Sequence, residues 1–131
     1  MSSEGRGAVL DASALLALIN SEPGAERVAQ ALPDACISAV NLSEVAGKLL
    51  DKGVSEADVD SHLGGLEIAV IEFDRTAALA AAALRRVVPR SLSLGDRACL
   101  ALGLSTGAVV LTADSQWKAV GLKGVAIVTI R

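Results

Sequence analysis

The sequence predicts an α/β fold of three layers, α/β/α, with a mainly parallel sheet in the middle. Four short apolar runs carry this prediction: AVL at 8–10, IAVI at 68–71, AVVL at 108–111 and VAIV at 125–128. Helical segments separate these runs, so the strands are expected to pair in parallel through crossover connections. The runs are continuous rather than alternating, which is typical of strands that helices cover on both faces of a sheet.

The first half of the chain alternates strands with helices. Pro23 is placed to open the second helix, Ser38 to cap the third, and Ser55 with Asp58 resembles a capping box for the fourth. The expected elements are a strand at 8–10, helices at 13–20 and 23–32, a strand at 35–37, a helix from Ser38 to Gly53, and a helix from 55 to about 63 that Gly64 and Gly65 end.

The second half repeats this pattern. Asp74 is placed to cap a long Ala-rich helix that Pro89 ends, and Gly107 turns the chain into the next strand. The expected elements are a strand at 68–71, helices at 76–88 and 94–104, a strand at 108–111, a short helix at 115–120 and a strand at 125–128.

Length and composition limit the classes of function. With 131 residues, the chain is long enough for one domain, which we assign to residues 1–131. It contains one Phe, one Trp and no Tyr, which argues against a nucleic-acid module that stacks bases on aromatic side chains. Cys36 and Cys99 each lie in an apolar segment, and we expect buried thiols rather than a disulfide or a metal pair.

No membrane span is expected, because the longest uncharged stretch, 98–113, is shorter than the ~20 residues that a span needs. The N-terminus lacks the features of a signal peptide, so a cytoplasmic location is expected. The net charge of -3 is unlike that of proteins that bind nucleic acid by bulk electrostatics. Two bound divalent cations would raise this net charge to roughly +1.

Four carboxylates fall where the carboxyl ends of the strands are expected. Asp11 ends the first strand, Asp114 follows the strand at 108–111, Asp96 lies in the first turn of a helix, and Glu44 lies within an apolar helix. In open α/β sheets, ligands bind at this edge. Carboxylates brought together repel one another unless a cation compensates their charge, and Mg²⁺ and Mn²⁺ prefer oxygen ligands. The single histidine, His62, is far from the four acids in sequence, which disfavours zinc.

Each acid also has a structural explanation. Asp96 complements a helix dipole, Glu44 with Lys48 forms an ordinary helical ion pair, and Asp114 can start a helix. Asp11 is the hardest to explain in this way, because an ionised carboxylate beside a core needs a partner. The four acids together favour a metal site.

The segments that carry these acids are VLDASALLAL, NLSEVAGKL, SLGDRACLAL and VLTAD. They resemble PIN-domain proteins, and in particular the VapC-type toxins of bacterial toxin–antitoxin modules, over residues 8–128. The resemblance implies a metal-dependent endoribonuclease that leaves 5′-phosphate and 3′-hydroxyl ends, a cognate antitoxin that covers the active-site groove, and a homodimer. It also implies roles for six residues: Asp11, Glu44, Asp96 and Asp114 as ligands of Mg²⁺ or Mn²⁺, and Ser13 and Thr112 as support for the acids or bound waters.

Further contacts are expected around this site. Arg97, beside Asp96, is the favoured contact to the RNA backbone, and the alternative is a solvated helix face. The basic cluster to which it belongs consists of Arg85, Arg86, Arg90 and Arg97. Trp117 either stacks on a base or packs in the core or an interface. Aliphatic residues on both faces of the helix at 13–20 predict part of a partner groove, and the resemblance implies that this partner is the antitoxin.

Two other classes of function stay open. The first is a phosphoryl-transfer domain on a similar sheet, which the sequence fits poorly. A receiver domain requires an acidic pair near the end of the first strand and a Lys after the last strand, and a dehalogenase-like phosphatase requires a second Asp where this chain has Ser13. A catalytically silent PIN-like binding or scaffold module would keep the fold without cutting RNA, although the presence of all four acids argues against it.

Overall fold

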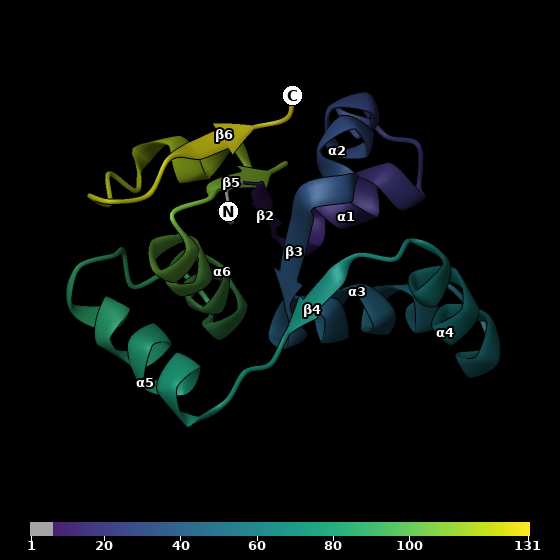
Figure 1. The fold of residues 1–131 in the computed structure, drawn as a ribbon, viewed down its shortest axis with the longest axis horizontal. Coiled ribbons are helices and arrows are strands. Elements are labelled where there is room, and N and C mark those ends of the chain that lie inside the picture. The colour runs from purple at the N-terminus through teal and green to yellow at the C-terminus, as the bar shows by residue number, and fades with distance from the viewer. Residues whose placement is uncertain (1–6) are drawn as a thin grey trace.

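The computed structural model describes residues 7–131 and has a five-stranded sheet at its centre (Figure 1). The strand order is β4-β3-β2-β5-β6, and every pair of neighbouring strands is parallel. The strands are β2 (Ala8–Leu10), β3 (Ala35–Ser38), β4 (Ala69–Ile71), β5 (Val109–Thr112) and β6 (Ile127–Thr129). The predicted α/β fold with a parallel sheet is confirmed.

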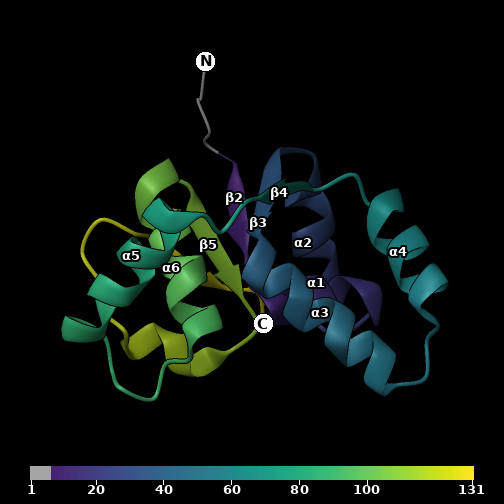
Figure 2. The ribbon, with the colours of Figure 1, turned by 90° about the horizontal axis from the view of Figure 1, so that it is seen from below.

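Helices cover both faces of the sheet (Figure 2). Ala8 and Leu10 of β2 pack in one core with α1 to α4, whereas Val9 packs in a second core with α5 and α6, because successive side chains of a strand point to opposite faces. The helices are α1 (Ala12–Ile19), α2 (Ala25–Ala31), α3 (Ala39–Asp51), α4 (Glu56–Gly65), α5 (Arg75–Ala83) and α6 (Leu94–Thr106), with 3₁₀ turns η1 (Leu32–Asp34), η2 (Leu84–Arg86) and η3 (Ser115–Ala119).

Local capping signals begin three of these helices where the sequence predicts them, whereas α2 begins at Ala25 after Gly24 rather than at the predicted Pro23. Ser38 caps α3, Ser55 caps α4 by accepting the N–H of Asp58, and Asp74 caps α5. Each side chain satisfies a backbone N–H that has no partner inside the helix.

Two predicted helix ends are wrong. Helix α4 continues through Gly64 and Gly65, because both glycines lie in its last turn, where a weak helix former costs only about 1 kcal/mol. Helix α5 ends at Ala83 rather than near Val88, and the chain tightens there into η2, which buries Leu84 and allows Val88 to reach the core.

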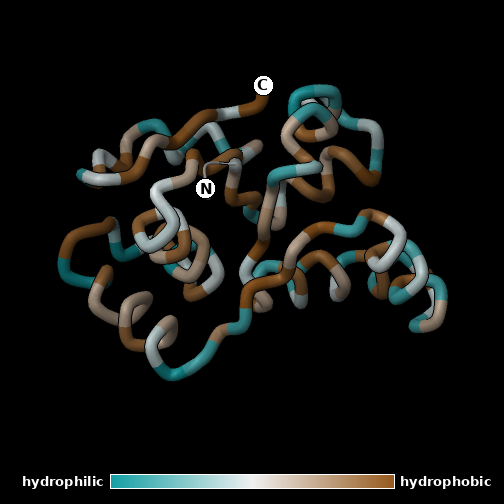
Figure 3. The backbone as a smooth tube through the Cα atoms, viewed as in Figure 1, coloured by the Kyte–Doolittle hydropathy of each residue, from teal (hydrophilic) through white to brown (hydrophobic). Residues whose placement is uncertain are grey.

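Strand β4 is not covered on both faces, in contrast to the prediction. Val70 is 44% exposed and Ile71 is 39% exposed, because β4 is an edge strand; hydrophobic residues follow one another along this edge (Figure 3). Only Ile68, just before the strand, is buried.

Packing accounts for part of the aliphatic surplus of α1. Leu16, Leu18 and Ile19 are half-buried against the core, and α2 packs closely on α1. The two thiols are free, with Cys99 buried and Cys36 half-buried. Over residues 7–131, no helix is both long and apolar enough to cross a membrane.

Candidate metal centre

A cavity of about 230 Å³ opens at the carboxyl edge of the sheet. All four acids predicted from the sequence line this cavity, although they come from four separate segments of the chain. Its lining consists of Asp11, Ala12, Ser13, Leu16, Asn41, Glu44, Lys48, Asp96, Asp114 and Trp117.

Asp11 lies at the end of β2 and is only 5% exposed. Its carboxylate caps α1 by accepting the N–H of Ala14 at 2.8 Å. Burial raises the pKa of Asp11 above its ordinary value, the hydrogen bonds to its carboxylate lower this pKa, and the negative charge of Asp96 raises it further. Asp11 is therefore a carboxylate whose ionised form a nearby cation would stabilise.

Two hydroxyl groups hold the Asp11 carboxylate. The Ser13 Oγ donates to Oδ1 at 2.8 Å, and the Thr112 Oγ1 donates to Oδ2 at 2.5 Å. Both hydroxyls also accept a backbone N–H from the segment after β5: Ser13 from Ala113 at 2.9 Å and Thr112 from Asp114 at 3.0 Å. The end of β2 and the end of β5 are thus tied together around Asp11.

Asp96 lies in the first turn of α6 and takes part in a capping box with Ser93. Its Oδ2 accepts the backbone N–H of Ser93 at 2.9 Å, and its own N–H donates to the Ser93 Oγ at 3.1 Å. This reciprocal pair of hydrogen bonds fixes the carboxylate at the N-terminus of α6.

Glu44 approaches this first turn of α6 from α3. Its Oε1 accepts the side-chain amide of Asn41 at 2.9 Å, and the same amide donates to the carbonyl of Gly95 at 3.0 Å. A Cβ at Gly95 would lie 2.5 Å from the Oε2 and 2.6 Å from the Oε1 of Glu44. The absence of a side chain at Gly95 therefore leaves the space that the Glu44 carboxylate occupies.

Asp114 is exposed, as is Glu44. It caps η3, and its Oδ1 accepts the N–H of Gln116 at 2.9 Å. Trp117, one turn further on, is 2% exposed and belongs to the core around α6. Core packing therefore accounts for the ring of Trp117, although one part of the residue reaches the cavity wall.

Comparison with known proteins identifies the family. The family model described as the PIN domain matches residues 8–123. This chain belongs to the PIN domain family. No curated protein matches the chain by sequence.

Solved structures share the fold of this PIN domain. A chain of a toxin–antitoxin complex from Klebsiella pneumoniae superposes with a TM-score of 0.75 at 22% identity, covering 95% of this chain and 98% of that one. A chain of DNA-bound VapBC from Salmonella typhimurium has a TM-score of 0.73 at 19% identity, with 96% and 99% covered. A chain of VapBC-5 from Mycobacterium tuberculosis has a TM-score of 0.58 at 24% identity, with 94% and 98% covered.

The donor set of this PIN domain fits a hard divalent cation. Among the described residues 7–131, the ionisable groups that line the cavity are the four carboxylates and Lys48, and neither cysteine lines it. Oxygen donors of this kind suit Mg²⁺ or Mn²⁺ and not zinc. Within residues 7–131, however, no three His, Cys, Asp or Glu side chains already stand in the arrangement that holds a metal ion. Several of the carboxylates instead accept hydrogen bonds at helix starts, so the acids converge on one cavity without closing into a coordination shell.

The structure separates Arg97 from this cavity. Its Nη1 donates to the carbonyl of Ala81 at 3.1 Å, which ties α6 to α5. Arg97 lines a small hollow with Arg85 and Arg90 instead. Two lining residues, Asn41 and Lys48, were not predicted for the site from the sequence, and neither was Gly95, which lies against Glu44. The sequence did contain a signal for Asn41, because a polar residue stands on the apolar face of a helix three positions before Glu44.

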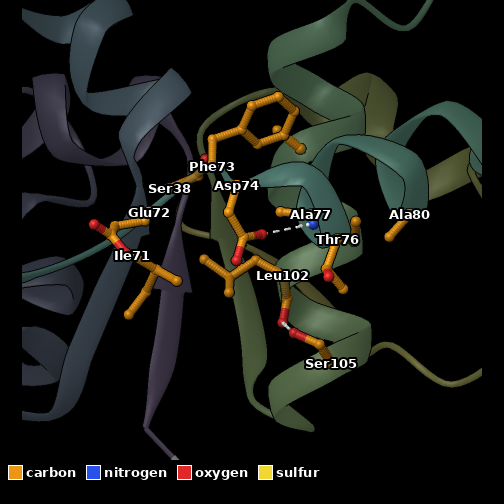
Figure 4. A pocket seen from close by; sticks show the side chains of 12 residues that line it. Ser38, Ile71, Glu72, Phe73, Asp74, Thr76, Ala77, Ala80, Leu102 and Ser105 are labelled. Carbon is orange, nitrogen blue, oxygen red and sulfur yellow. Dashed lines mark hydrogen bonds between the residues drawn. The ribbon is translucent and has the colours of Figure 1, made fainter.

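A second cavity, of about 340 Å³, lies between β4, α5 and α6 (Figure 4). Its carboxylates do not include any of the four acids, and Asp74 there caps α5 through the N–H of Ala77 at 2.9 Å. The other lining residues are mostly apolar or small, and no Lys, Arg or His is among the described residues of its lining.

Proposed function

We propose that this PIN domain is a divalent-metal-dependent endoribonuclease, formed by residues 1–131 as one domain, and the toxin of a toxin–antitoxin pair. The observation that carries the proposal is the convergence of Asp11, Glu44, Asp96 and Asp114 on one cavity. Four carboxylates around one space repel one another, and a cation of Mg²⁺ or Mn²⁺ type compensates such a set.

In this proposal, Asp11 and Asp96 are the principal ligands and Glu44 and Asp114 complete the set. A bound divalent ion supplies an acidified water and stabilises the charge on the leaving oxygen during phosphodiester hydrolysis. Ser13 and Thr112 keep the Asp11 carboxylate in place through their hydroxyl donors. The capping box does the same for Asp96.

The proposed reaction is hydrolysis without a covalent intermediate. Water attacks the phosphorus in line, the bond from phosphorus to the 3′ oxygen breaks, and the products carry 5′-phosphate and 3′-hydroxyl ends. No carboxylate acts as a nucleophile, since the role of all four would be to hold the metal and orient the attacking water.

Two basic residues are candidates for contact with the RNA backbone. Lys48 lines the cavity and is exposed, so its ammonium can meet a phosphate at the site itself. Arg97 remains a proposed contact from the adjacent basic cluster, although its Nη1 already donates to Ala81. RNA bound across the cavity would meet Lys48 first.

The proposal includes an antitoxin and a homodimer. Chains of similar fold belong to a toxin–antitoxin complex from Klebsiella pneumoniae and to the VapBC family of toxin–antitoxin systems in Mycobacterium tuberculosis, which supports an antitoxin partner. Exposed Val70 and Ile71 on the edge strand β4 support a protein contact there, because edge strands with apolar side chains readily pair or become covered. With RNA as the substrate and an antitoxin as the partner, we expect the protein to act in the cytoplasm.

The test is cleavage of an RNA pool by purified protein with Mn²⁺, with Mn²⁺ plus chelator, and with Asp96→Asn. Asp58→Asn is the matched control, since Asp58 also lies three residues after a Ser cap but outside the cavity. We expect cleavage by the wild type and by Asp58→Asn only. Equal cleavage by Asp96→Asn would refute the site, and antitoxin binding without any cleavage would favour the silent scaffold module.

A further inference from the structure

Asn41 is the most deeply buried polar residue of the cavity wall. It is 1% exposed and lies one turn before Glu44 on α3. Its Nδ2 donates both to the Glu44 Oε1 at 2.9 Å and to the Gly95 carbonyl at 3.0 Å. These two acceptors use both protons of the amide nitrogen, and they belong to helices that are far apart in sequence.

The other end of the Asn41 amide is unsatisfied. Its Oδ1 is buried and has no hydrogen-bond partner in the part of the chain that the structure describes. A buried acceptor without a donor costs stability, so the amide is a poor solution if its purpose is to stabilise the fold. The two hydrogen bonds that Nδ2 donates therefore call for a role other than stabilisation of the fold.

We infer that Asn41 is a positioning residue of the metal centre, which holds the Glu44 carboxylate against the first turn of α6 and so sets its place relative to Asp96. This inference rests on the proposed function. Asn41 acts through Glu44 and does not touch the substrate. Asp96 is fixed on α6 by its capping box, whereas Glu44 comes from α3. The Asn41 amide links Glu44 to the carbonyl of Gly95, the residue before Asp96.

The geometry predicts that a substitution of Asn41 can keep the fold stable and still weaken metal binding. In Asn41→Leu, a side chain of similar size keeps the packing and removes the unsatisfied Oδ1 together with the two hydrogen bonds. Glu44 is exposed and can accept water instead, and the Gly95 carbonyl still lies within the hydrogen-bonded first turn of α6. Loss of a residue that orients a metal ligand lowers metal affinity by about 10- to 100-fold.

The experiment compares the wild type, Asn41→Leu, Glu44→Ala, the double variant and Ser43→Ala. Ser43 is the matched control because it is exposed on the same helix and does not line the cavity. Mn²⁺ affinity is measured by titration calorimetry, the melting temperature by circular dichroism, and RNA cleavage under single-turnover conditions. Asn41→Ala, which places the best helix former at this position, serves as a second variant if the Leu side chain does not fit.

We expect Asn41→Leu to lose about 10-fold or more in Mn²⁺ affinity while its melting temperature stays within about 5 °C of the wild type. In the Glu44→Ala background the same change should have almost no effect on Mn²⁺ affinity, because Asn41 has nothing left to position. Additive losses in the double variant, or wild-type Mn²⁺ affinity in both Asn41 variants, would overturn the inference alone. Failure of the wild type to bind Mn²⁺ would overturn the proposed function and, with it, this inference.

Discussion

Substitution of Gly95 by Ala should raise the stability of the fold and lower the rate of RNA cleavage. The three atoms nearest to an added Cβ all belong to the Glu44 carboxylate group, at 2.5, 2.6 and 2.7 Å. No backbone atom is among them, so the flexible end of Glu44 yields rather than α6. To reach the 3.4 Å of an ordinary contact from 2.5 Å, the carboxylate has to shift by about 0.9 Å.

The expected magnitudes follow from this shift. A displacement of about 1 Å at a reacting site costs on the order of 100-fold in rate. At the same time, Gly95 does not have a positive φ, so Ala is compatible with its backbone and should stabilise the fold by about 0.4–1 kcal/mol. We therefore expect cleavage to fall by about two orders of magnitude while the melting temperature rises by a few degrees.

The assay pairs single-turnover RNA cleavage in Mn²⁺ with thermal unfolding of the same samples. Gly47→Ala is the matched control, because Gly47 lies within α3 and a Cβ there meets no atom within 4 Å. It should stabilise the protein without a change in rate. Wild-type cleavage by a stabilised Gly95→Ala would refute the reasoning, since it would show that the position of the Glu44 carboxylate does not matter.

Further outcomes test the groups around Asp11. Because burial raises the pKa of Asp11 above 3.8, the folded state keeps this proton to higher pH than the unfolded state, and the stability of the metal-free protein falls as the pH rises from 3.8 through the folded-state pKa. Asp11→Asn should remove this fall and raise the free energy of unfolding at neutral pH in chemical denaturation, while cleavage is lost; an unchanged pH profile would contradict this. Thr112→Val should destabilise the fold by about 1–3 kcal/mol in urea denaturation, because Asp11 and the Asp114 N–H each lose a partner, and wild-type stability would argue against these hydrogen bonds. Lys48→Ala should weaken RNA binding and reduce its salt slope by about 1, and an unchanged slope would move the phosphate contact to Arg97.

Much of the fold follows from local signals in the sequence. Ser38, Ser55 and Asp74 each start a helix because a side-chain oxygen satisfies a backbone N–H only two or three residues away. The continuous apolar runs predict parallel strands, and parallel strands bring their carboxyl ends to one edge. For this reason the sequence could place Asp11 and Asp114 near one another without knowledge of the packing.

Other features depend on how the layers pack. Strand β4 is partly exposed because it lies at the edge of the sheet, and the order of strands in the sheet cannot be inferred from the apolar run of β4 itself. Arg97 is adjacent to Asp96 in sequence, yet its guanidinium meets the Ala81 carbonyl because α5 packs against α6. Successive side chains of a helix point about 100° apart around its axis, so two residues that are neighbours in sequence face different surroundings.

The sequence by itself determined the order of strands and helices, the capping residues and the set of acids at the carboxyl edge. The resemblance implied that Ser13 and Thr112 support the acids, but only the tertiary structure decided that both hydroxyls bind Asp11. It also decided the contact of Asn41 and Glu44 with Gly95, which lies 54 residues away from Asn41. The physical reason is range. Capping and periodicity act over a few residues along the chain, whereas the distance between two carboxylates on different helices is set by side-chain packing between layers, to within a fraction of an ångström.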